Sequence, residues 1–82
     1  MLKAEIKVLL KQGVLDPQGQ AAEKSLSALG YQNINQVRIG KYLEVTLNEK
    51  DRTAAEAQVR EMCTRLLTNA VIEDYTFELV EV

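Results

Sequence analysis

The fold is decided near the N-terminus by the stretch LKAEIKVLL, residues 2–10. Apolar side chains occupy every even position of this stretch, whereas positions 3, 5 and 7 carry lysine or glutamate. An alternation of period two predicts a β-strand that covers a core with one face and meets water with the other. Such a strand needs neighbours in a sheet and a covering layer on its apolar face, and the following residues provide candidates for both.

A turn and a short helix are predicted directly after this strand. The string GVLDPQG, residues 13–19, breaks the alternation, and Asp16 followed by Pro17 is typical of a helix start. Apolar residues then recur at helical spacing at Ala22, Leu26 and Leu29. Gly30 stands where a left-handed residue would end the helix. Because no Lys-Ser or Lys-Thr follows the loop and an acidic residue occupies the cap, we interpret residues 13–19 as a structural turn rather than a phosphate site.

The middle of the chain contains two apolar runs, residues 34–39 and 42–47, on either side of Gly40-Lys41. Two pairs would keep the apolar faces of these runs together: Ile39 with Leu43, and Val37 with Val45. That register requires a three-residue connection through Gly40, Lys41 and Tyr42, or a bulge at the glycine. A single bent strand also fits, since the odd-numbered apolar pattern continues through Gly40. We favour the hairpin.

A second helix and a last strand complete the pattern. Asp51 is a plausible helix cap, and the apolar stripe that follows consists of Ala55, Val59, Met62, Cys63, Leu66 and Leu67. The last strand alternates through Tyr75, Phe77 and Leu79. The alternation fails at residues 80–82, where apolar groups also point the other way, and we interpret this as part of a subunit interface.

The predicted order is strand, helix, strand, strand, helix, strand within a single domain of residues 1–82. We therefore expect an α+β fold of the ferredoxin-like βαββαβ type, with a four-stranded antiparallel sheet and two helices on one face. The other face of the sheet has no helix to cover it. Its expected side chains are Lys3, Lys7, Tyr42, Glu44 and Thr46. Such an open face is where we expect a partner protein or a second copy of the chain.

The composition excludes several kinds of site. Ten basic and twelve acidic residues give a net charge of −2, which is untypical of proteins that bind nucleic acid. The chain has no histidine and one cysteine, so an internal disulfide, a His–Cys zinc site and a nucleophile–histidine pair are all excluded. Cys63 lies in a helical apolar stripe, and we interpret it as a small buried hydrophobe rather than a nucleophile. We expect no catalytic, cofactor or metal site.

No apolar run approaches the roughly 18–20 residues that span a bilayer. The N-terminus also lacks the pattern of a secretory signal peptide. We therefore expect a cytoplasmic protein without a membrane segment.

Four strings stand in order along the chain: GVLDPQG at 13–19, VRIGKYLE at 37–44, MC with LL at 62–67, and VIEDY at 71–75. Together they resemble the PurS family, the small subunit of phosphoribosylformylglycinamidine synthase, and the resemblance covers essentially all 82 residues. One departure is Ala70, where the family usually has proline before Val71. The departure leaves the turn into the last strand less rigid.

The resemblance implies a role in purine biosynthesis. The complete enzyme of this family converts formylglycinamide ribonucleotide, glutamine and ATP to formylglycinamidine ribonucleotide, glutamate, ADP and phosphate. A glutaminase subunit (PurQ) releases ammonia, and a large subunit (PurL) binds ATP and magnesium and forms the amidine. The small subunit is implied to be a non-catalytic bridge that binds no cofactor itself, assists ammonia transfer, and self-associates as a dimer or tetramer.

Four residues of the 13–19 loop and the 38–44 segment are candidates for partner contacts: Asp16, Arg38, Lys41 and Tyr42. They carry more specific chemistry than a turn requires. The alternative is that these segments only satisfy backbone geometry at their glycines. Two other functions remain open at this point, namely a small ligand-sensing regulatory module of the same fold and a purely structural oligomerisation domain.

Overall fold

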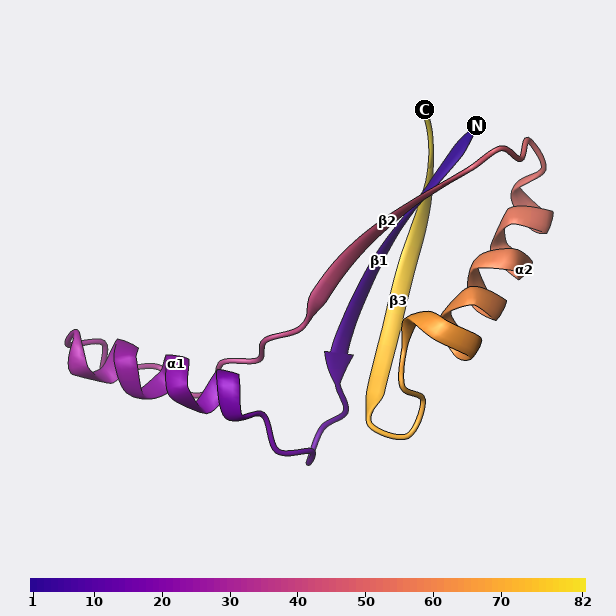
Figure 1. Ribbon diagram of the computed structural model, residues 1–82. Coiled ribbons are helices and arrows are strands. Elements are labelled where there is room, and N and C mark those ends of the chain that lie inside the picture. Colours follow the sequence, from indigo (N-terminus) through magenta and orange to yellow (C-terminus); the bar gives the residue numbers. More distant parts are fainter.

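The strand β1 (Leu2–Leu10) lies at the centre of a three-stranded antiparallel sheet. In the computed structural model, which describes residues 1–82, β2 (Lys41–Leu47) lies along one edge of β1 and β3 (Glu73–Glu81) along the other (Figure 1). Two helices connect the strands, α1 (Pro17–Ala28) between β1 and β2, and α2 (Arg52–Met62) between β2 and β3. The chain is therefore an α+β fold, as the sequence predicts.

The core forms between the apolar face of β1 and helix α2. The even-numbered side chains of β1 from Leu2 to Val8 are at most 4% exposed, which confirms the predicted one-sided strand. Helix α2 begins at the Asp51 cap, whose carboxylate accepts a hydrogen bond from the Thr53 amide. It contributes two fully buried side chains, Ala55 and Val59, and Cys63, which directly follows the helix, is the third. Burial of these residues is the main source of stability, because each apolar group leaves water.

The apolar stripe of α2 differs from the prediction at its end. The last turn, η1 (Cys63–Leu67), is a π-helical turn in which the carbonyl of Cys63 accepts from the Thr68 amide and hydroxyl. A π turn contains an extra residue, so it rotates the following side chains relative to an α-helix. Leu67 consequently packs on the core, whereas Leu66 is 83% exposed.

The opposite face of the sheet is open, as predicted. The strand register places Lys3 beside Thr46 and Lys7 beside Tyr42 on this face. Glu5 lies opposite Glu44, and the Lys3 ammonium lies 3.7 Å from the Glu5 carboxylate and 3.6 Å from the Glu44 carboxylate. Lys3 thus offsets the repulsion between two like charges on neighbouring strands.

The predicted hairpin at Gly40 is wrong, and the chain forms three of the four expected strands. Residues 31–40 form neither helix nor strand, and the chain continues through Gly40 directly into β2. A tight hairpin would favour a left-handed conformation at this glycine, but only Gly13 and Gly30 have positive φ. Gly40 instead lies against β1, where an added Cβ would collide with the Val8 carbonyl oxygen. The glycine therefore permits close backbone approach and not a reversal.

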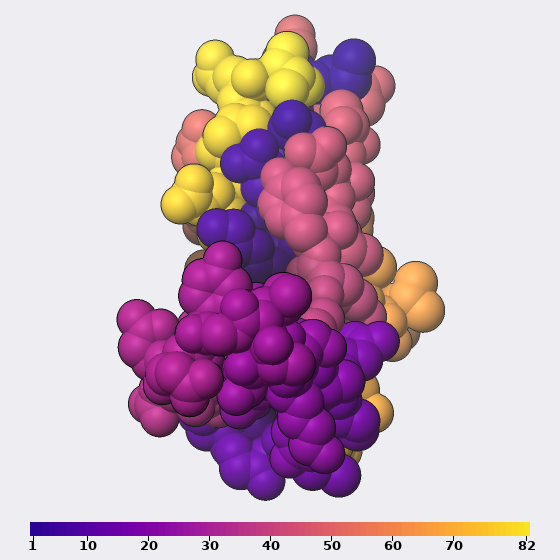
Figure 2. All heavy atoms as spheres, turned by 90° about the vertical axis from the view of Figure 1, so that its left-hand side faces the viewer, coloured from indigo at the N-terminus to yellow at the C-terminus, as the bar shows by residue number.

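Helix α1 also departs from the expectation that both helices lie on one face. It projects beside the sheet (Figures 1 and 2), its only buried residue is Gly19, and Leu29 is 75% exposed. The chain measures 49 × 27 × 14 Å, with a radius of gyration of 16.2 Å. A compact chain of this length would have a radius of gyration of about 12 Å. The chain is thus elongated because the α1 region extends away from the sheet.

At the C-terminal end of β3, Val80 lies on the open face opposite Lys3 and Val82 is exposed. The alternation of apolar and polar side chains therefore breaks at the end of β3, while the role of these residues in a subunit interface stays a prediction.

Neither helix combines the length and the apolar character needed to cross a membrane.

We predict that Val59→Ala lowers the free energy of unfolding by about 2 kcal/mol, because it leaves a cavity between α2 and β1. Val71→Ala makes the same chemical change at a side chain that is 81% exposed, and should cost less than about 0.5 kcal/mol. Urea unfolding at matched protein concentration measures both. Equal losses for the two variants would contradict the placement of α2.

Candidate partner surface

Asp16 joins the two segments that the sequence selects as partner contacts. It is the N-cap of α1, as predicted, and one carboxylate oxygen accepts from the Gly19 amide at 2.9 Å. The other oxygen accepts from the Ile39 amide at 3.0 Å, across 23 positions of sequence. Gly19 is required here, since an added Cβ would collide with the Val37 carbonyl oxygen. The start of α1 is therefore fixed to the residues that precede β2.

The same hydrogen bonds determine the acidity of Asp16. The amides of Ile39 and then Gly19 stabilise the carboxylate and hold its pKa below the usual 3.8, with a smaller contribution from the charge of Arg38. Asp16 therefore remains ionised well into the acidic range. Its carboxylate is already bound to two amides, which makes it a positioning group for this surface.

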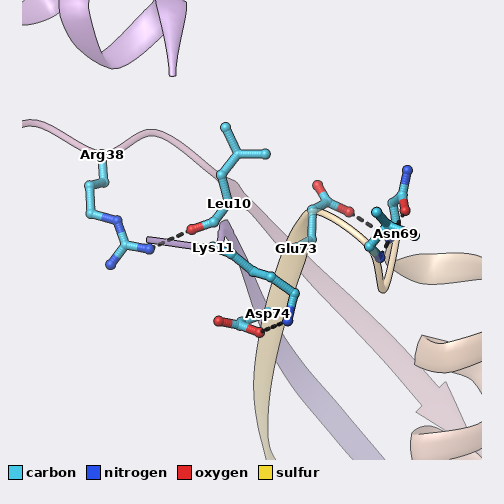
Figure 3. Close-up of polar contacts among 7 residues, drawn as sticks. Leu10, Lys11, Arg38, Asn69, Glu73 and Asp74 are labelled. Carbon is cyan, nitrogen blue, oxygen red and sulfur yellow. Dashed lines mark hydrogen bonds and ion pairs between the residues drawn. The ribbon is translucent and has the colours of Figure 1, made fainter. Parts of the chain in front are cut away.

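Arg38 reaches from the segment before β2 to the end of β1. Its guanidinium donates to the Leu10 carbonyl at 2.6 Å, and Figure 3 shows this contact beside the pair formed by Lys11 and Asp74. The Lys11 ammonium lies 2.8 Å from the Asp74 carboxylate, and the Lys11 amide donates to the Ile72 carbonyl. These contacts tie the end of β1 to the start of β3 on one side and to residue 38 on the other.

Two hydrogen bonds between Asn69 and Glu73 close the turn before β3, next to the ion pair of Lys11 and Asp74. The Asn69 amide donates to the Glu73 carboxylate at 2.7 Å (Figure 3), and the Glu73 amide donates back to the Asn69 carbonyl. This reciprocal pair orders the turn, in which residue 70 is alanine rather than proline. The start of β3 is consequently well defined.

Lys41 lies in a shallow pocket of about 360 Å³, which we call the junction pocket. Its lining consists of Leu10, Asp16, Pro17, Gln18, Ile39, Gly40, Lys41 and Glu73. Lys41 is exposed and forms no salt bridge within the chain. The structure therefore brings Asp16, Arg38 and Lys41 to one end of the sheet, with Lys41 available to an acidic group of a partner.

Tyr42 lies apart from the other three candidates, because neighbouring strand residues point to opposite faces. It stands on the open face, and its hydroxyl donates to the Glu44 carboxylate at 2.9 Å. Desolvation, followed by this hydrogen bond, raises the pKa of Tyr42 to about 12. A second pocket of about 390 Å³ on this face is lined by Glu5, Lys7, Tyr42, Thr76, Phe77 and Glu78.

The structure also shows where side chains that could bind metal or act as a nucleophile lie. No cluster of three His, Cys, Asp or Glu side chains is arranged to hold a metal ion. Cys63 is buried in the core, and desolvation raises the pKa of its thiol. A buried thiol with a raised pKa is a poor nucleophile, which agrees with the structural interpretation of this residue.

Sequence reasoning missed the contacts that assemble this end of the sheet. Lys11 and Asp74 are 63 positions apart, and Arg38 binds a backbone carbonyl 28 positions away. No local pattern indicates either contact. The only signal was that Arg38 and Asp74 lie in two of the four family-like strings, while their partners Leu10 and Lys11 lie in none.

Comparison with known proteins gives a consistent result. The family model described as "PurS: Phosphoribosylformylglycinamidine (FGAM) synthase" matches residues 3–81. The Bacillus subtilis phosphoribosylformylglycinamidine synthase subunit PurS is 48% identical over 82 residues, covering all of this chain and 96% of that protein.

Two solved structures share the fold. Methanocaldococcus jannaschii PurS, described as one of the subunits of formylglycinamide ribonucleotide amidotransferase in the purine biosynthetic pathway, superposes with a TM-score of 0.88 at 34% identity. The match covers 100% of this chain and 99% of that one. A chain of PurLQS from Thermotoga maritima superposes with a TM-score of 0.87 at 26% identity, covering 96% of both chains.

We predict that acid weakens the link between α1 and residue 39. Because the pKa of Asp16 is lowered in the folded state, its stabilising contribution is complete above the unfolded pKa near 4 and is lost as pH falls through the folded pKa. Asp16→Asn should therefore be less stable than the parent at pH 6, with a difference that shrinks below pH 4. Urea midpoints measured from pH 2 to pH 7 give this difference.

Glu23→Gln is the matched control, because it neutralises a carboxylate elsewhere on α1. Its difference from the parent should not show the same loss of stability at neutral pH. A pH-independent effect of Asp16→Asn would contradict the role assigned to the two amide hydrogen bonds.

Proposed function

The chain belongs to the PurS family of phosphoribosylformylglycinamidine synthase subunits, and on this basis we propose that it bridges the glutaminase and synthetase subunits of that enzyme. The observation that carries this proposal is the match of residues 3–81 to the family model. The Thermotoga maritima PurLQS chain, which superposes over 96% of this one, supports a role inside a complex with PurL and PurQ partners. The chain is thus one subunit of a ligase of purine biosynthesis.

The reaction steps that we assign to each subunit follow from the side chains that this chain lacks. Release of ammonia from glutamine requires an activated nucleophile, but the chain has no histidine and its one thiol is buried. We assign glutamine hydrolysis to the glutaminase partner, and binding of ATP and magnesium to the large subunit. The small subunit then acts by holding the two together so that ammonia passes between them.

Two surfaces are available for this bridging role. The junction pocket presents Lys41 beside a rigid frame formed by Asp16 and Arg38. The open face presents Tyr42 in a second pocket on the other side of the sheet. A subunit with contacts on two sides is suited to joining two partners.

Self-association is also part of the proposed function. The exposed apolar residues of the α1 region and the elongated shape support it, since isolated chains of this size are usually compact. No observation favours a separate ligand-sensing role.

We predict that glutamine-dependent formation of the amidine product requires this chain, whereas ammonia-dependent formation does not. The large subunit alone has the synthetase chemistry, so added ammonium salt should bypass the bridge. The measurement compares both nitrogen sources with the two partner subunits, in the presence and absence of this chain. Omission should lower the glutamine-dependent rate at least about tenfold, and an unchanged rate would overturn the bridging role.

We further predict that Tyr42→Ala weakens binding to the partner subunits at least about tenfold, because exposed tyrosines often carry much of an interface's energy. Tyr31→Ala is the matched control at a tyrosine of similar exposure outside both proposed surfaces. Titration of the labelled chain with its partners measures the affinity. Equal effects of the two substitutions would remove Tyr42 from the interface.

A further inference from the structure

The outer edge of β3 has no neighbouring strand. In the sheet order β2-β1-β3, β3 pairs only with β1 (Figure 1). Its register with β1 runs without a bulge from Glu73 to Glu81, and it contains neither proline nor lysine. Edge strands of natural proteins usually carry such features, which prevent pairing with another chain. The regular open edge of β3 therefore favours the addition of a further strand.

The hydrogen-bonding pattern shows which backbone groups face this edge. One position beyond the register of β1 with β3, the Lys11 amide donates to the Ile72 carbonyl. Residues at the even-numbered positions of β3 consequently bond to β1. Because alternate residues of an antiparallel strand direct their polar groups to opposite edges, the amides and carbonyls of Tyr75 and Phe77 face outward.

Helix α2 confirms this direction at the next odd-numbered residue, Leu79. The Arg52 guanidinium donates to the Leu79 carbonyl at 3.0 Å, as expected for a carbonyl that points away from β1. No side chain of the protein binds the backbone of Tyr75 or Phe77. Their outward amides and carbonyls are therefore free for a second protein.

A groove of about 650 Å³ lies at this edge, between β3 and α2. Its apolar lining includes Tyr75 and Phe77, whose rings stack with their centroids 6.4 Å apart. Both side chains are half-buried on the core face, where a further strand would extend their cover. The groove thus offers apolar surface directly beside the unpaired backbone of the same two residues.

The side of the groove formed by α2 is rich in arginine. Arg52, Glu56 and Arg60 follow one another at four-residue spacing along one face of the helix. The Arg60 guanidinium lies 5.6 Å from the centroid of the Phe77 ring and 3.8 Å from the Glu56 carboxylate. Arg52 forms no salt bridge, and its contact with Leu79 leaves most of the guanidinium donors free.

Charge complementarity selects the chemistry of a segment added here. Glu78, the remaining charged residue of the lining, is even-numbered, so its side chain points to the open face rather than toward α2. The α2 side of the groove thus has an excess of positive charge. A segment with an acidic side chain on that side would bind Arg52, whereas a basic one would be repelled.

We propose that an extended segment of a partner subunit adds to the outer edge of β3 as a further strand, with an acidic side chain of that segment bound to Arg52. Backbone hydrogen bonds to Tyr75 and Phe77 hold the segment, and the groove selects its side chains. The inference rests on the proposed function and deepens it, because it gives the bridging chain a defined contact with one of its partners.

An extended segment fits this edge better than a helix does. The backbone groups of a helix bond within the helix, so a docked helix would leave those of Tyr75 and Phe77 unpaired. A strand lies about 4.8 Å from its neighbour and directs alternate side chains to one face. Side chains on that face reach the groove, and the acidic one lies near Arg52, at the Leu79 end.

Amide hydrogen exchange tests the pairing on the parent chain. In the isolated protein, the outward amides of Tyr75 and Phe77 should exchange faster than those of Thr76 and Glu78, which bond to β1. Saturation with the large synthetase subunit and the glutaminase subunit should slow exchange at Tyr75 and Phe77 at least about tenfold. Mass spectrometry with residue resolution, after an acid quench, reads all of these amides.

Three outcomes of this measurement would overturn the proposal. If the amides of Tyr75 and Phe77 already exchange slowly in the isolated protein, the edge is occupied without a partner subunit. If the partner subunits bind but these amides stay fast, the partners contact another surface, and the bridging role still stands. If neither partner binds, the bridging role fails as well.

Reversing the charge of Arg52 tests the acidic contact. Arg52→Glu should weaken binding of the partner subunits at least about tenfold, because two acidic groups would then face each other. Arg65→Glu is the matched control, at an exposed arginine in the turn after α2 whose ion pair with Glu61 measures 2.8 Å. It should change the affinity less than about twofold. Equal effects of the two substitutions would remove Arg52 from the interface, and the exchange measurement decides the pairing even if a variant is unstable.

Discussion

The close approach of Gly40 to the Val8 carbonyl is the constraint on which the rest of the structure depends. It holds the chain straight where a hairpin would otherwise reverse it, so residues 31–40 run on from β2 instead of folding back beside it. The hydrogen bonds of Asp16 then keep α1 with that segment and away from its own sheet. One backbone contact thus separates a compact core, formed by β1 and α2, from a projecting region that has no core of its own.

Local patterns predicted those parts of the fold that depend on local physics. The alternation in residues 2–10, the stripe through Ala55 and Val59, and the cap at Asp16 follow from strand and helix periodicity and from unpaired amides at a helix start. The path at Gly40 was not predictable in this way. An odd-numbered apolar pattern fits a hairpin and a straight strand equally well, and the choice between them depends on β1, some thirty positions earlier.

The candidate partner surface likewise has features that the sequence predicted and features that depend on distant residues. Asp16, Arg38 and Lys41 were selected from family-like strings, and the structure brings them together at one end of the sheet. No local sequence pattern predicts the ion pair of Lys11 and Asp74. The exposure of Leu66 depends on a single π turn, which periodicity cannot indicate. The absence of histidine, in contrast, was informative from composition alone, because it excludes a nucleophile–histidine pair within this chain.

The most direct test of this account is the free energy of unfolding of Gly40→Ala, measured by urea denaturation beside the parent chain. An added Cβ at this position would collide with the Val8 carbonyl oxygen, so the account predicts a loss of at least about 2 kcal/mol. An unchanged free energy of unfolding would contradict the close approach of Gly40 to β1.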